Sequence, residues 1–191
     1  RELANWASVR WGFLMGGLIA VGYTTQTVGL HYTSPNNSAF ITALSVIIVP
    51  FILLIFHKIR PSRFVGIGVM LALAGLILMT RPELGNVNKG DLWTLLCALS
   101  YAIYLARLNY AYEKVSYLNL IFWTMIFSTV ITAFWAVAIE TTFVTWNTEV
   151  ISALVITATL CTLLGVYLHT RYQQFTTATR AALIFSSEPV F

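Results

Sequence analysis

The chain has 191 residues, of which 58% are hydrophobic and only 9% are charged, and its mean hydropathy is +0.78. Soluble domains normally carry about 25% charged residues, so this composition excludes a soluble globular protein and indicates an integral membrane protein. The net charge of +4 does not indicate a nucleic-acid partner, because in a membrane protein the location of positive charges matters more than their sum.

Seven apolar segments follow one another along the chain. A membrane-spanning helix needs about 20 mainly apolar residues. The complete segments are 11–30, 39–56, 64–80, 92–110, 118–139 and 150–172, and a seventh runs from 178 to 191. The pairs Ser34–Pro35 and Gly90–Asp91 are predicted to form the cap and first turn of the helix that follows each. The prediction is an all-α polytopic membrane helix bundle, and we expect the chain to be a fragment of a longer protein.

Positive charges are distributed unequally between the two sides that these segments define. The starting side holds Arg1, Arg10, Lys58, Arg60, Arg63, Arg107, Lys114, Arg171 and Arg180, and the other side holds Arg81 and Lys89. Cytoplasmic loops carry an excess of Lys and Arg. We therefore predict a multi-pass protein of the cell membrane, with the loops after Phe56, Tyr110 and Tyr172 in the cytoplasm.

A sequence motif at the start of the second segment recurs at the start of the seventh. A shift of 143 residues places Gly22 on Gly165, Tyr32 on Phe175, Thr33 on Thr176, Ser34 on Thr177, Ala39 on Ala182 and Ile41 on Ile184. The period is five segments, an odd number, so the two copies must cross the membrane in opposite directions. Inverted repeats recur in secondary transporters. We predict an inverted repeat of two five-helix halves. Residues 1–82 are expected to hold the last three helices of the first half, and residues 83–191 the first three helices and most of the fourth of the second half.

Polar side chains inside the apolar segments are the candidates for a transport path, because polar groups in hydrocarbon are costly. Glu188 is expected about 15 Å deep in its helix, and Pro189 weakens the turn beside it. Glu188 is therefore predicted to carry a proton or cation, the alternative being a protonated Glu that only bonds a neighbouring helix. Gln26 and its repeat-equivalent His169 can donate and accept hydrogen bonds, or can simply join helices.

Two stripes of polar residues at helical spacing are further candidates for lining an aqueous cavity. They are Ser38, Thr42 and Ser45 on the second segment and Ser100, Tyr104 and Arg107 on the fourth, although Arg107 is expected to reach the cytoplasmic interface. The predicted substrate pathway consists of Gln26, Ser45, Ser100, Tyr104, His169, Ser187 and Glu188, with Pro50 and Pro189 as hinges.

Other chemistries are not indicated. Cys97 and Cys161 lie in apolar runs without paired spacing, so they are predicted to be small buried residues rather than a disulfide or metal ligands. No Walker-type phosphate loop, HExxH or CxxC motif is present. We expect no cofactor and no enzymatic activity. Gly12, Gly16 and Gly17 are small residues at a spacing typical of close helix contacts.

Three stretches resemble the EamA family of the drug/metabolite transporter superfamily. They are GYTTQTVGLHYTSPNNSAFITALSVIIVP, NKGDLWTLLCALSYAIY and TTATRAALIFSSEPVF, the last containing the family's EPVF signature at residues 188–191. The resemblance implies ten helices in two inverted halves with both termini cytoplasmic, of which this chain holds helices three to nine. No carboxylate stands in the first half at the position equivalent to Glu188, so a symmetric acidic pair is not expected.

The same resemblance implies secondary transport of a small metabolite, often as export, by alternating access without ATP. The expected partners are a small-molecule substrate and the lipid bilayer, with proton coupling and a homodimer left open and no nucleic acid. The alternative is a non-transporting membrane protein, either a scaffold or an intramembrane enzyme whose key residues lie in the missing ends.

Overall fold

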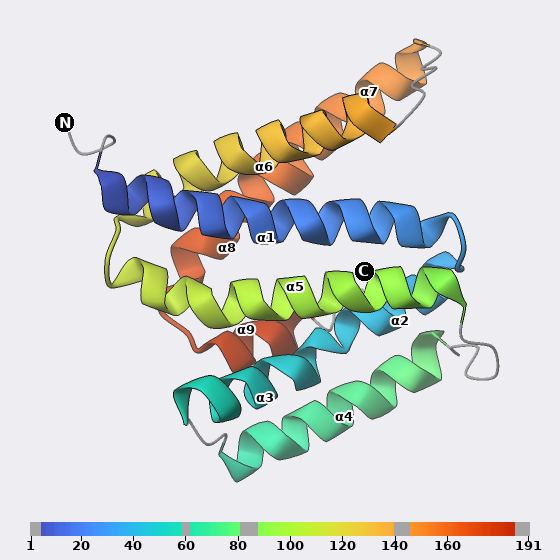
Figure 1. Ribbon diagram of the computed structural model, residues 1–191. Helices are drawn as coiled ribbons and strands as arrows, with labels where there is room; N and C mark the ends of the chain where they lie inside the picture. Colours follow the sequence, from blue (N-terminus) through green and yellow to red (C-terminus); the bar gives the residue numbers. More distant parts are fainter. Residues whose placement is uncertain (1–4, 59–61, 81–87, 140–145, 186–191) are drawn as a thin grey trace.

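The computed structural model describes residues 5–58, 62–80, 88–139 and 146–185, and in these ranges every regular element is a helix (Figure 1). The elements are α1 (Trp6–Leu30), α2 (Pro35–Ala43), α3 (Ser45–His57), α4 (Arg63–Thr80), α5 (Lys89–Tyr112), α6 (Tyr117–Ile139), α7 (Thr148–Ile156), η1 (Thr157–Leu164), α8 (Gly165–Gln173) and α9 (Ala178–Phe185). Five stretches within them are long and apolar enough to cross a membrane. The predicted all-α class is confirmed, and so is a chain with several apolar spanning helices.

The predicted segments overlap the helices, with ends that differ by up to five residues, and three of the differences have a structural cause or consequence. Helix α1 begins five residues early, because the Asn5 side chain accepts a hydrogen bond from the Ala7 amide and caps it. The second segment is divided at Leu44 into α2 and α3. The sixth contains a π-helical stretch, η1, between α7 and α8, with main-chain bonds one residue longer than in an α-helix.

One of the two predicted helix starts is correct and the other is displaced. The Ser34 hydroxyl accepts a hydrogen bond from the Asn37 amide at 3.2 Å, and Pro35 opens α2 as expected. At α5 the cap is Asn88 rather than Gly90. Asn88 and Asp91 exchange side-chain-to-main-chain bonds of 2.9 and 3.0 Å, which form a capping box. Gly90 has a packing role instead.

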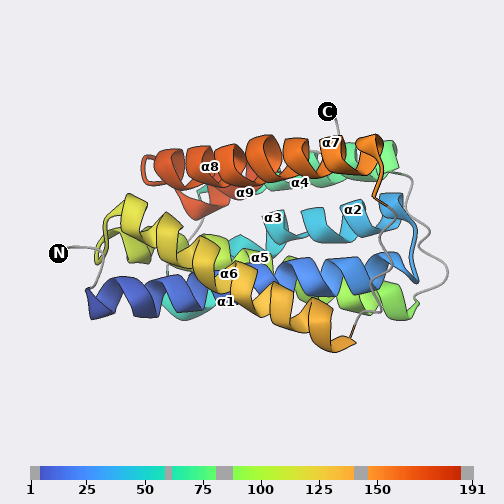
Figure 2. The same ribbon diagram turned by 90° about the horizontal axis from the view of Figure 1, so that it is seen from above.

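Helix α1 lies between α5 and α6 and packs along both. On the other side of α5 lie α2, α3 and α9, and α4 is an outer helix that contacts α2 and α9. Figure 2 shows α7 and α8 running as one rod along the edge of the bundle opposite α1. The chain therefore passes back and forth between two ends, and the buried residues concentrate on α1, α3, α5 and α9.

Glycines set how closely α1 approaches its neighbours. A Cβ atom built on Gly12 would lie 2.1 Å from the Cβ of Trp123 on α6, and one on Gly16 would lie 2.7 Å from the Thr124 carbonyl oxygen. Neither position has room for a side chain. By contrast, a Cβ on Gly17 would meet nothing within 4 Å. The predicted close contact therefore forms through Gly12 and Gly16 and does not involve Gly17.

A buried carboxylate joins the α1–α2 turn to the start of α5. Asp91 is only 7% exposed, and its Oδ1 accepts hydrogen bonds of 2.6 Å from both the Thr33 hydroxyl and the Asn37 amide. Its Oδ2 accepts from the Asn88 main-chain amide. These three donors satisfy the charge of Asp91, and no basic side chain in the described part of the chain pairs with it. Here a Cβ on Gly90 would also lie 2.5 Å from the Gly29 carbonyl oxygen, so the joint is closely packed.

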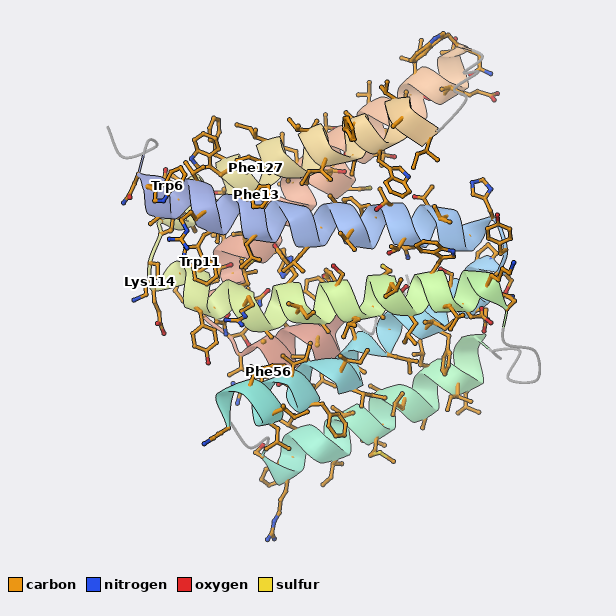
Figure 3. All side chains as sticks on the ribbon, viewed as in Figure 1. Trp6, Trp11, Phe13, Phe56, Lys114 and Phe127 are labelled. Carbon is orange, nitrogen blue, oxygen red and sulfur yellow. The ribbon has the colours of Figure 1, made fainter. Side chains whose placement is uncertain are left out.

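The outer surface of the bundle is apolar, as lipid contact requires. Phe64 and Val137 are 84% and 87% exposed. Such exposure is costly in water and suited to a hydrocarbon environment. Figure 3 shows Trp6 and Trp11 near Lys114 at one end of the bundle, which is the arrangement of an interfacial aromatic belt.

The glycine contact predicts a difference between two otherwise similar substitutions. Gly12→Ala should lower the free energy of unfolding of the full-length protein by about 1–3 kcal/mol, because the new methyl group overlaps Trp123. Gly17→Ala is the matched control and should not lower it, because its methyl group enters open space. Denaturant titration in mixed micelles measures both values, and equal losses would contradict the close approach of α1 and α6.

Candidate functional site

A cavity of about 440 Å³ lies inside the bundle between α1, α2, α5, η1, α8 and α9. The residues that line it are Leu18, Ile19, Gly22, Tyr23, Gln26, Thr42, Cys97, Tyr101, Tyr104, Cys161, Gly165, Val166, His169 and Phe185. None of these described residues is acidic, Lys or Arg. The cavity combines apolar and aromatic surface with a few polar groups, as small-molecule sites usually do.

Most residues that line the cavity occupy equivalent positions in the two copies of the repeat. Each of them lies 143 positions from another lining residue, which is the offset of the repeated motif. The pairs are Leu18 with Cys161, Gly22 with Gly165, Tyr23 with Val166, Gln26 with His169, and Thr42 with Phe185. Equivalent faces of the two copies therefore meet at one cavity.

The local structure at the two copies also agrees. Ser34 and Thr177 each cap the next helix, accepting from the Asn37 and Arg180 amides at 3.2 and 3.4 Å. The turn before each cap has the same main-chain bond, from Tyr32 to Gly29 at 2.9 Å in the first copy and between the equivalent residues at 3.0 Å in the second. The repeated motif therefore adopts the same turn twice.

One contact recurs between the copies with different chemistry. The Gln26 amide nitrogen donates to the Thr42 hydroxyl at 3.3 Å, which joins α1 to α2. At the equivalent positions the rings of His169 and Phe185 join α8 to α9, with centroids 4.6 Å apart. The cavity consequently has a hydrogen-bonding part on the first copy and an aromatic part on the second.

Four rings form a closed circuit along one wall of the cavity. Tyr101 and Tyr104 stack at 6.0 Å, and Tyr104 meets His169 edge-on at 5.8 Å. Phe185 contacts both His169 and Tyr101, the latter at 6.1 Å. Each such pair contributes roughly 0.5–1.5 kcal/mol beyond its buried area. The circuit holds α5, α8 and α9 together at the cavity.

The structure brings some predicted site residues together and leaves others apart. Gln26, Tyr104 and His169 all line the cavity. Ser100 does not, because its hydroxyl donates to the Leu18 carbonyl at 2.8 Å and bonds α5 to α1. Ser45 is buried at the start of α3, away from the lining. Their roles in a pathway stay predictions.

The remaining predicted site residues lie elsewhere. Ser187, Glu188 and Pro189 are outside the described residues. Pro50 lies inside α3, whereas the interruption of that span is at Leu44, so the hinge at Pro50 stays a prediction. Cys161 is exposed rather than buried, because η1 packs on little of the bundle, whereas Cys97 is buried as expected.

The sequence does not distinguish several of the cavity residues from ordinary residues of a membrane-spanning helix. Tyr23, Tyr101 and Phe185 look like ordinary apolar-segment aromatics. Gln173 is buried just outside the cavity, and its side chain bonds both the His169 ring and the Leu105 carbonyl, the latter at 3.2 Å. Only its spacing of four residues from His169 hinted at a contact.

Hydrogen bonds close the bundle at the end where α5 and α8 finish. The Tyr112 hydroxyl donates to the Thr170 carbonyl at 2.6 Å. The Asn109 amide donates to the Thr176 carbonyl at 3.3 Å, and the Gln173–Leu105 bond lies in the same region. At the opposite end, α7 and η1 contain no buried residue. The rod of α7, η1 and α8 is therefore anchored at one end of the bundle.

Comparisons with known proteins agree on the kind of protein. The sequence profile described as the EamA-like transporter family matches residues 2–81 and 88–191. A protein of Archaeoglobus fulgidus described as an uncharacterized transporter is 35% identical over 181 residues, which are 94% of this chain and 58% of the relative. The chain therefore spans less than two thirds of that relative's length.

The different burial of the two cysteines predicts selective modification. A maleimide should react with Cys161 in the detergent-solubilised full-length protein, because this thiol is exposed at the cavity, and should spare Cys97, which is buried on α5. Mass spectrometry of the labelled protein locates the adduct. The Cys161→Ser variant is the control and should remain unlabelled at Cys97, so equal modification of the two thiols would contradict the arrangement of η1.

Proposed function

We propose, since this chain belongs to the EamA-like transporter family, that it is part of a secondary transporter that moves a small metabolite across the cytoplasmic membrane by alternating access. The family and the apolar spanning helices establish a multi-pass membrane protein of transporter type. The mechanism, direction and site are the proposal.

The observation that carries the proposal is the paired lining of the cavity. Alternating access by an inverted repeat needs a central site to which both halves contribute equivalent surfaces. Gln26 with His169 and Thr42 with Phe185 provide two such pairs. This pairing supports two inverted five-helix halves, of which the chain would hold parts, within a ten-helix protein.

The hydrogen bonds at one end favour a particular stage of the transport cycle. Tyr112, Asn109 and Gln173 join α5 to the end of α8 and the following turn, whereas α7 and η1 at the other end are unburied. We assign the closed end to the cytoplasm because most basic residues are expected there. The loops after Phe56, Tyr110 and Tyr172 would then be cytoplasmic, and the structure would be outward-facing.

The remaining features of the mechanism rest on the sequence. Export is the proposed direction, following the resemblance to the family. Glu188, outside the described residues, is the proposed proton carrier, and a homodimer stays a prediction. A scaffold or an intramembrane enzyme is the alternative function, but neither requires equivalent faces of two repeats to meet at one cavity.

Sided labelling tests alternating access. Gln26→Cys, in full-length protein with Cys97 and Cys161 replaced by Ser, is placed in sealed, oriented vesicles. An impermeant maleimide should modify the introduced cysteine from the outside in the outward-facing state and from the inside in the inward-facing state, because Gln26 lines the central cavity. The rate of adduct formation from each face is the measurement.

The control for this labelling is Gly17→Cys, on the same helix. Gly17 lines a separate apolar groove between α1 and α5, so it should resist the reagent from both faces once lipid fills that groove. Protection of Gln26→Cys from both faces, in the presence and absence of a proton gradient, would refute alternating access at this cavity.

The closed end predicts how a single hydroxyl affects the cycle. Tyr112→Phe removes the bond to the Thr170 carbonyl and keeps the ring. Loss of one hydrogen bond costs about 0.5–1.5 kcal/mol, so inside labelling of Gln26→Cys should rise roughly two- to tenfold. Tyr32→Phe, at an exposed tyrosine in the turn between α1 and α2, is the comparison variant and should have a smaller effect. Unchanged inside labelling in Tyr112→Phe would show that this bond does not hold the cytoplasmic end closed.

A further inference from the structure

The orientation of the Gln173 amide is fixed by a main-chain carbonyl. An amide nitrogen only donates hydrogen bonds and an amide oxygen only accepts them. The Leu105 carbonyl, 68 residues away in sequence, lies 3.2 Å from Gln173 Nε2 and can only accept. The other amide atom, Oε1, is therefore the one that faces His169 Nε2. Rotating the amide would place two oxygens against each other.

This arrangement determines which ring nitrogen of His169 carries a proton. The atom that faces Gln173 Oε1 is Nε2, so Nε2 must be the donor. The rings of Tyr104 and Phe185 pack against the imidazole, and a charge buried between them would be costly, so the neutral ring is favoured. A neutral imidazole has one donor and one acceptor nitrogen. Nδ1 is therefore the acceptor.

The acceptor nitrogen belongs to a residue that lines the cavity. Gln173 is buried and is not part of the lining, whereas His169 is. The bond to Gln173 thus engages Nε2 with a residue outside the lining, and no described residue forms a hydrogen bond with Nδ1. The rings of Tyr104 and Phe185 contact the imidazole and provide apolar surface beside it.

We propose that His169 Nδ1 is a fixed hydrogen-bond acceptor for the transported solute, that Gln173 positions it, and that the solute presents an N–H or O–H donor next to an apolar or planar group. This inference rests on the proposed function of the cavity and specifies its substrate class. Apart from His169 itself, the described lining carries no acidic, Lys or Arg side chain, and the proposal is therefore for an uncharged donor portion of the solute.

The first experiment determines the tautomer without needing transport. Full-length protein labelled with ¹⁵N-histidine is studied in lipid bilayers by solid-state NMR, and subtraction of the His169→Phe spectrum identifies the His169 signals. The expected result is a neutral ring protonated at Nε2. Gln173→Leu should yield a mixture of tautomers, whereas Gln174→Leu should not, because Gln174 is exposed and bonds only the Arg171 carbonyl.

The second experiment tests the donor requirement with two neutral probes. Benzamide carries an N–H donor, and N,N-dimethylbenzamide has none. Benzamide should bind about tenfold more tightly to the wild-type protein, the effect expected of one hydrogen bond. The preference should disappear in His169→Phe and Gln173→Leu and persist in Gln174→Leu. If Gln173 had only a structural role, Gln173→Leu would lower the affinity for both amides by the same factor.

The two proposals fail in different ways. A ring protonated at Nδ1, or equal or absent binding of the two amides, overturns the acceptor assignment even if sided labelling shows alternating access. The expected tautomer and donor preference in a protein that shows no alternating access would support the acceptor assignment and refute transport.

Discussion

The close approach of α1 to its neighbours is the constraint on which the rest of the structure depends. Lipid offers little hydrophobic driving force between helices, so contacts are made by close packing and by side-chain hydrogen bonds. Gly12 and Gly16 bring α1 against α6, and Gly29 brings it against the start of α5. With α1 fixed against both neighbours in this way, its face between the two contacts, which includes Gln26, is directed to the cavity.

Most of the fold was predictable because a bilayer makes strong demands on a sequence. Spanning segments must be long and apolar, and their ends need caps, so Ser34 and Pro35 marked a boundary correctly. The break at Leu44 and the π-helical stretch were not predicted, since neither has a distinctive local residue. These features depend on how neighbouring helices pack.

The candidate site was predicted in part for a related reason. Helical spacing tells which residues share a face, but not which neighbour that face meets. Ser100 and Tyr104 share a stripe on α5, yet Ser100 bonds the α1 backbone while Tyr104 reaches the cavity. The repeat was more informative, because it identified both Gln26 and His169. The spacing of Gln173 from His169 allowed a contact between the two, but the bond of Gln173 to Leu105 was not predictable, since Leu105 is distant in sequence.

The equivalent α1–α2 and α8–α9 contacts are made by different kinds of side chain, and this difference has an energetic consequence. If the proposed inverted halves were perfectly symmetric, the two end states would be related by a two-fold rotation and equally populated. Here the first contact is an amide and a hydroxyl, Gln26 and Thr42, and the second is two rings, His169 and Phe185. Under the proposed alternating access, the resting preference of the protein for one side of the membrane would be set by these few side chains, and single substitutions would change it.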